Sequence, residues 1–98
     1  MSYRSTKIDD NQKEIVAALG AAGCSVDSLA AVGGGVPDLL VGLRGHTYLL
    51  EVKDGRKVPS ARQLTPAQKK WIPAWRGRPV AVVKNTKEAL HAVGFDIK

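Results

Sequence analysis

The sequence predicts one α/β domain over residues 1–98, with elements in the order α-β-β-α-β-α and a mixed three-stranded sheet flanked by helices. Three observations predict this class. An amphipathic helical pattern opens the chain, two apolar runs joined by a tight turn follow it, and a well-capped helix leads into a further apolar run. The 44% apolar content is typical of a globular domain and excludes a disordered chain.

The first helix is predicted from an apolar stripe at Ile15, Ala18, Leu19 and Ala22, with Gly23 as its stop. Before it, residues 1–8 are expected to form a loose N-terminus. After it, residues 25–32 have helical spacing but are few and end in glycines. We therefore expect a connecting loop with a turn of helix there.

Two buried strands are predicted at residues 39–43 and 47–53. A two-residue turn at 44–45 would place Asp38 opposite Glu51, whereas a four-residue turn at 44–47 would place it opposite Lys53. Glu51 and Lys53 share a face of their strand, because side chains alternate. Either register therefore brings two carboxylates and an ammonium together at the open end of the hairpin.

A second helix is predicted to begin at Thr65, with Pro66 at its first position and Gln68 completing a capping box. Pro73 is expected to bend this helix or end it early. Trp71 and Trp75 are four residues apart, and we expect them to pack on the sheet, with stacking on nucleobases as the alternative.

The last two elements are a strand at residues 79–83 and a short helix at residues 87–93. The strand is apolar throughout, which favours a central place in the sheet. Asn85 or Thr86 is the expected cap of the helix, and Gly94 its stop.

The facing carboxylates Asp38 and Glu51 repel each other unless a cation lies between them. Carboxylate oxygens with water suit Mg²⁺ or Mn²⁺. Lys53 could then orient an attacking water or stabilise negative charge on a phosphate. The alternative is a plain hairpin with a solvated end and an incidental ion pair.

Gly-Val-Pro-Asp-Leu at residues 35–39, followed by Glu-Val-Lys at 51–53, resembles the PD-(D/E)xK nuclease superfamily and, within it, the virus-type replication-repair nuclease (VRR-NUC) domain. The resemblance covers about residues 14–95. It implies a compact nuclease core and a metal-dependent DNA endonuclease. It also implies the small stand-alone form, a homodimer that acts on branched DNA such as four-way junctions in repair or recombination.

The resemblance further implies roles for three residues. Glu14 on the first helix would complete the metal site, although a solvated helix glutamate explains it equally well. The backbone carbonyl of Val52 would be a further metal ligand. Gln68 would point towards the active site, whereas the capping box alone is a sufficient account of it.

Residues 53–78 hold eight basic residues and one acid, a net charge of +7 in a chain whose total is +6. A basic surface beside carboxylates suits a nucleic-acid backbone, although such runs also serve as solvated faces. Within it, residues 54–63 are predicted to form a mobile basic loop. The expected DNA contacts are Arg56, Lys57, Arg62, Lys69 and Lys70.

Cys24 is the only cysteine, which suggests a reducing cytoplasm, in a bacterial or phage-infected cell. Residues 1–11 lack the apolar core of a signal peptide, and no apolar run is long enough to span a membrane. His46 and His91 lack partners at zinc-ligand spacing. The triple glycine at 33–35 does not continue as a phosphate-binding loop, and no small-molecule cofactor is expected.

The leading hypothesis is a Mg²⁺- or Mn²⁺-dependent, structure-selective DNA endonuclease that acts as a homodimer. A basic module that holds DNA or RNA for a partner enzyme is the alternative. An enzyme for a small phosphorylated substrate is a third class, which the open basic stretch and the missing phosphate-binding motif disfavour.

Overall fold

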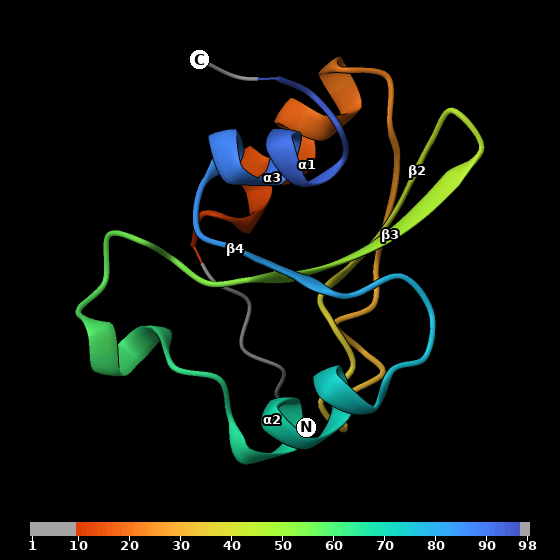
Figure 1. Ribbon diagram of the computed structural model, residues 1–98. Helices are drawn as coiled ribbons and strands as arrows, with labels where there is room; N and C mark the ends of the chain where they lie inside the picture. The colour runs from red at the N-terminus through yellow and green to blue at the C-terminus, as the bar shows by residue number, and fades with distance from the viewer. Residues whose placement is uncertain (1–9, 97–98) are drawn as a thin grey trace.

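The computed structural model describes residues 10–96, and the predicted loose N-terminus at residues 1–8 lies outside this range (Figure 1). It contains four strands, three α-helices and one 3₁₀ helix within those residues. In chain order these are α1 (Gln12–Ala21), β1 (Ser25–Ser28), β2 (Leu39–Leu43), β3 (His46–Val52), η1 (Pro59–Arg62), α2 (Pro66–Ala74), β4 (Ala81–Val83) and α3 (Thr86–Ala92).

The central hairpin of the sheet has the shorter of the two predicted turns. Leu43 pairs with His46, and Leu39 pairs with Leu50. Arg44 and Gly45 both have positive φ, 53° and 82°, as a tight two-residue hairpin turn requires. Continued by one residue, this register places Asp38 opposite Glu51.

Within residues 10–96 the sheet has four strands, so the prediction of three was wrong by one. The additional strand is β1, in the segment expected to be a loop with a turn of helix. It pairs antiparallel with β2, from Ser25 opposite Gly42 to Ser28 opposite Leu39. An exposed edge strand of four residues carries almost no apolar alternation, and Val26 alone is half-buried among them.

The prediction that the last strand is central was also wrong. The strand order is β1-β2-β3-β4, with β4 at the edge and parallel to β3. The residues of β4 are apolar because α3 packs on one face of the strand, and not because the strand has neighbouring strands at both of its edges. Val83 is buried, whereas Val82 faces outwards and is 42% exposed.

The apolar core lies between the sheet and the pair α1 and α3, which pack against each other on the same side of it (Figure 1). The predicted stripe of α1 supplies Ile15 and Leu19, both almost fully buried. The strands and α3 supply the rest of the core: Leu39, Val41, Leu50, Val52, Val83, Ala89 and Val93. Leu50 and Val52 therefore face α1 and α3, and Glu51 and Lys53 face the other way.

The other side of the sheet is faced by α2 and the segment that precedes it (Figure 1). The predicted capping box is confirmed: the Thr65 hydroxyl accepts from the backbone N–H of Gln68 at 3.2 Å, and the Gln68 Oε1 accepts from that of Thr65 at 2.8 Å. The helix ends one residue after Pro73, as expected. The loop at residues 54–63 is not wholly irregular, because η1 forms its second part.

The expectation that both tryptophans pack on the sheet is not met for Trp75, which is exposed, whereas Trp71 is half-buried. None of the residues Pro66–Ala74 of α2 is buried. Trp71 and Trp75 instead stack on each other, with ring centroids 5.1 Å apart and planes 14° from parallel. Trp75 is 45% exposed.

Candidate active site

A pocket of about 340 Å³ opens between β3, the start of α2 and the loop that leads into β2. Its wall contains three of the predicted site residues together, Asp38, Glu51 and Lys53, and Gln68 closes it from α2. Val52 also lines it, through the main chain between the two charged residues. The remaining lining residues are Ala30, Gly33, Gly35, Val36, Ala61, Gln63 and Thr65.

Asp38 is fixed at the point where the chain enters β2. The buried Pro37 precedes it, and its backbone carbonyl accepts from the Leu29 N–H at 2.7 Å. One carboxylate oxygen, Oδ2, accepts from the Val52 N–H at 2.7 Å. This bond extends the hairpin by a side-chain link and turns Asp38 towards the residue opposite it, Glu51.

Glu51 is almost completely withdrawn from water, with 1% of its surface exposed. Its Oε2 accepts from Gln68 Nε2 at 2.9 Å, whereas Oε1 has no hydrogen-bond partner among residues 10–96. Burial, and then the charge of Asp38, raise the pKa of Glu51 to about 8, and Lys53 opposes the shift. Two acidic side chains held together out of water are costly unless a proton or a cation lies between them.

Lys53 lies beside Glu51 on the same face of the sheet. Its Nζ is 3.5 Å from Glu51 Oε2 and donates to Gln68 Oε1 at 2.9 Å. Gln68 therefore serves both of the roles that sequence reasoning set against each other. Its Oε1 accepts from the helix cap and from Lys53, while its Nε2 donates to Glu51.

Glu14 is not brought to this pocket. Its side chain is 62% exposed, and its carboxylate lies 3.6 Å from the guanidinium of Arg56. The expectation that it reaches inwards is not met in the structure, because its side chain leaves α1 on the solvent side. No group of three or more His, Cys, Asp or Glu side chains is placed to hold a metal within residues 10–96.

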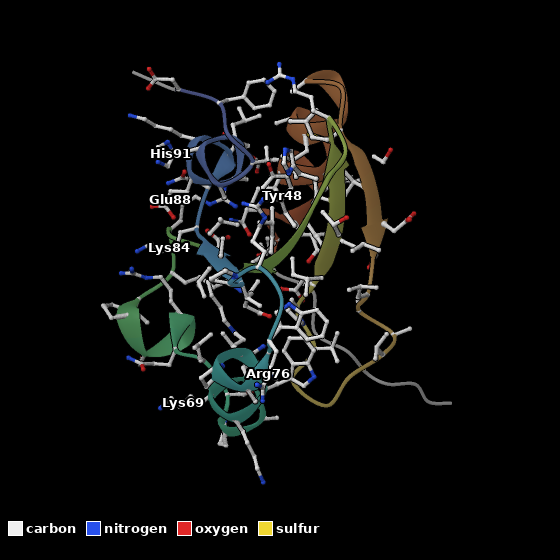
Figure 2. The ribbon with its side chains drawn as sticks, turned by 45° about the vertical axis from the view of Figure 1, so that its right-hand side comes forward. Tyr48, Lys69, Arg76, Lys84, Glu88 and His91 are labelled. Atoms are coloured by element: carbon white, nitrogen blue, oxygen red, sulfur yellow. The ribbon has the colours of Figure 1, made fainter. Side chains whose placement is uncertain are left out.

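The predicted DNA contacts are distributed over the loop and α2. Arg56 pairs with Asp54 at 2.9 Å, and Arg62 donates to the backbone carbonyl of Lys57 at 2.7 Å. Lys69 and Lys70 are exposed on α2. Figure 2 shows Lys69 and Arg76 together at the α2 end of the molecule, away from Glu88 and His91 on α3.

Two residues that support the site were not singled out from the sequence. Asn11, just before α1, donates through Nδ2 to the backbone carbonyls of Lys53 at 3.1 Å and Lys84 at 2.9 Å, and so ties together the ends of β3 and β4. Asp54 is buried, and hydrogen bonds from Arg56 lower its pKa to about 2. Neither residue has a sequence signal beyond its being polar.

The mixed sheet, with Asp38, Glu51 and Lys53 gathered at the end of its central hairpin, defines an α/β core of the nuclease type. A comparison with solved structures finds a VRR_NUC domain with a TM-score of 0.63 and 32% sequence identity, covering 84% of this chain and 88% of that domain. Comparisons with protein-family models and with curated proteins give no match. The chain belongs to the VRR-NUC family, and the predicted resemblance is confirmed.

The helices between residues 10 and 96 are too short and too polar for any of them to cross a membrane.

Proposed function

We propose that this protein is a metal-dependent DNA endonuclease that hydrolyses phosphodiester bonds. The observation that carries the proposal is that the buried Glu51 is held against Asp38, so that two acidic side chains share one pocket and raise the pKa of Glu51. A fold needs no such arrangement, because a carboxylate in this place costs stability by itself. Membership of the VRR-NUC family supports the same reading.

The residues present fit a divalent cation. Oxygens of Asp38 and Glu51 meet in an open pocket, and hard oxygen donors with room for water are the ligands that Mg²⁺ and Mn²⁺ prefer. Asp38 and Glu51 would hold the ion, with the Val52 carbonyl as a further candidate. When bound, the ion would supply a Lewis acid that polarises the phosphate and lowers the pKa of a bound water.

The protein's own contribution to the reaction is charge and position. Gln68 holds the Lys53 ammonium at 2.9 Å, so this cation has a fixed place at the rim of the carboxylate pair. There it would neutralise charge that develops on the phosphate and orient the attacking water. Gln68 donates a hydrogen bond to Glu51 Oε2, and this bond would keep the Glu51 side chain from rotating.

The substrate proposed is DNA, and branched DNA such as a four-way junction in particular. No acidic residue occurs from residue 55 to residue 87, and this stretch contains the parts of the loop and of α2 that line the pocket, at Ala61, Gln63, Thr65 and Gln68. Such a surface binds phosphates without reading bases, so selectivity would come from the shape of the DNA. A two-fold homodimer would present two pockets and cut two strands of a junction symmetrically.

The test is cleavage of a labelled four-way junction, a linear duplex and a single strand, each with Mg²⁺, Mn²⁺ or EDTA. Asp38→Asn keeps an acceptor for the Val52 N–H but removes a charge from the proposed ion site. We expect the wild type to cut the junction in the presence of either metal, and Asp38→Asn to be at least about a thousandfold slower.

Val82→Ala, on the exposed edge strand, is the control and should cut like the wild type. Salt-sensitive binding by every variant without cutting of any substrate would overturn the nuclease proposal and favour the binding module. Metal-dependent cutting of all three substrates alike would retain the nuclease and reject the junction preference. Sedimentation of the protein alone and with the junction would decide whether it acts as a dimer.

A further inference from the structure

We propose that the stacked pair Trp71 and Trp75 is a binding site for an unpaired nucleobase of DNA beside the candidate active site. The inference rests on the proposed function, since it supplies a role for single-stranded segments next to the cleaved bond. It goes beyond that function because it assigns a base-binding surface, and with it a preference for DNA that has an unstacked end or a branch.

Trp71 is half-buried and Trp75 is exposed, and packing in the apolar core does not account for the pair. Neither contributes to the apolar core found within residues 10–96. Their rings stack in near-parallel planes, and Trp75 keeps 45% of its surface open to solvent. A tryptophan face left open in this way is the kind of surface on which nucleobases stack in single-strand binding proteins.

The conformation of Trp75 is held rather than free. The backbone of Trp75 leaves the helix in an extended conformation after Pro73, which ends α2, yet its ring returns to lie over Trp71. Gly77 makes room for it, because a Cβ at residue 77 would lie 2.7 Å from the indole Nε1. A preorganised ring loses little entropy when a ligand stacks on it.

The pair is joined to the active-site pocket through Gly35. This residue lines the pocket, and its φ of 89° belongs to the region that favours glycine. A Cβ there would collide with the Ala67 carbonyl and come within 3.0 Å of the Trp71 Cβ. The loop that carries Asp38 therefore packs directly against the first turns of α2.

The spacing suits a DNA strand that leaves the pocket. Trp71 and Trp75 follow Gln68, which lines the pocket, by three and seven residues. At about 1.5 Å per residue, Trp71 lies about 4.5 Å along α2 from Gln68, and the ring of Trp75 stacks on that of Trp71, so the pair lies within a few base steps of about 3.4 Å from the pocket. A strand with its phosphate at Asp38 and Glu51 could thus place a nearby base on the exposed indole.

The charge around the pair matches the same ligand. Lys69 and Lys70 directly precede Trp71 on α2, and Arg76 directly follows Trp75. Figure 2 shows Lys69 and Arg76 at this end of the molecule. No acid occurs within this part of the chain. An exposed aromatic ring flanked by cations matches both parts of a nucleic acid, the flat bases and the negatively charged backbone.

The test uses the full chain carrying Asp38→Asn, with EDTA, so that nothing is cut. Because Trp71 and Trp75 are the only tryptophans in the sequence, intrinsic fluorescence reports on this site alone. An oligonucleotide of twelve thymidine nucleotides should quench the tryptophan fluorescence. An abasic oligonucleotide of the same length and charge should not quench it. Anisotropy of labelled DNA measures the affinity in parallel.

Trp75→Ala, added to Asp38→Asn, should weaken binding of the thymidine oligonucleotide about tenfold, and binding of a blunt duplex less than about twofold. Trp75→Phe should recover part of the loss, and Val82→Ala, another exposed apolar side chain, should change neither affinity. Thermal unfolding of each variant confirms that it is folded.

The proposal fails if saturating single strand leaves the fluorescence unchanged, or if Trp75→Ala weakens duplex and single strand equally. A fall in sedimenting mass on Trp75→Ala, without quenching by DNA, would assign the pair to a contact between copies of the chain. None of these outcomes bears on metal-dependent cutting, which the wild-type cleavage assay measures separately. Loss of that cutting would likewise leave the fluorescence result standing.

Discussion

The two faces of the sheet are built from the same strands but by opposite rules. On the face covered by α1 and α3, the strands present apolar residues, as with Leu50 and Val52 of β3. On the other face β3 presents Glu51 and Lys53, and the helix that faces them buries none of its own residues. One strand thus alternates between a hydrophobic core and a polar pocket at each step.

This difference teaches where the stability and the chemistry of the domain reside. Apolar burial on the α1 and α3 face stabilises the fold, whereas the carboxylates on the α2 face oppose it. Substitutions on the two faces should therefore have opposite signatures. Those on the core face should lower stability, and those in the pocket should lower activity at little cost to the fold or with a gain.

After Asp38→Asn, the largest effect is expected from Lys53→Met, which keeps the length of the side chain and removes its charge. Cleavage should fall about 10²–10³-fold, because a cation aimed at the developing phosphate charge is lost. The melting temperature should change by no more than a few degrees. Single-turnover cleavage rates and a thermal melt measure both effects. A large loss of stability with normal cleavage would contradict the proposed difference between the two faces of the sheet.

Leu50→Ala should show the opposite signature. Removing this fully buried side chain should cost about 3 kcal/mol in the free energy of unfolding. Denaturant unfolding measures it, with Val82→Ala as a control on the neighbouring strand, expected within about 0.5 kcal/mol of the wild type. Below its melting temperature the Leu50→Ala protein should still cut, since Leu50 faces away from the pocket.

Glu51→Gln should stabilise the metal-free protein at alkaline pH. The folded pKa of Glu51 is about 8 and the reference value is 4.5, so the folded state holds a proton that the unfolded state releases between these values. The stability of the wild type should consequently fall as the pH rises from about 4.5 to about 8. Above that range Glu51→Gln should be more stable than the wild type.

Thermal melts with EDTA at pH 5 and pH 8.5 measure this effect, and the two curves of Glu51→Gln should differ less than those of the wild type. Added Mg²⁺ should raise the wild-type melting temperature at pH 8.5 and leave that of Glu51→Gln almost unchanged. Equal pH dependence of the two proteins would mean that Glu51 is ionised and stable in the folded state without a cation.

The smallest effect is expected from Thr65→Ala, which removes the side-chain cap of α2. The loss should be about 1 kcal/mol or less in global stability. Because Gln68 loses a partner of its capping box, cleavage should also fall several-fold, and Thr65→Ser should restore both. Unchanged cleavage in Thr65→Ala would show that the bonds of Gln68 to Lys53 and Glu51 hold it without the cap.

Much of the fold could be predicted because its signals are local. The stripe of α1, the two-residue turn at Arg44–Gly45 and the capping box at Thr65 each arise within a few residues. The errors concern pairing at the sheet edges. β1 has four mostly exposed residues and owes its structure to β2, and β4 is apolar because of α3 rather than because of neighbours on both sides.

The candidate site could be predicted where the hairpin register decides it, and less well elsewhere. The pairing of Leu39 with Leu50 brings Asp38 to Glu51 and Lys53, so sequence spacing was sufficient for these residues. The direction of the Glu14 side chain depends on Arg56, which lies far along the chain. The support that Asn11 gives to β3 and β4 depends on three-dimensional packing that no periodicity records.

The double bonding of Gln68 has a consequence for which sequences this position can accept. A helix cap alone would be satisfied by glutamate as well as by glutamine. The pocket needs one donor for Glu51 and one acceptor for Lys53, and glutamate lacks the donor and adds a third negative charge. Asparagine has both groups but is one methylene too short to reach from α2. Residue 68 must therefore satisfy two requirements at once, the start of a helix and the hydrogen bonds of a charged pocket. A substitution by glutamate, which the helix alone would tolerate, is excluded by the pocket.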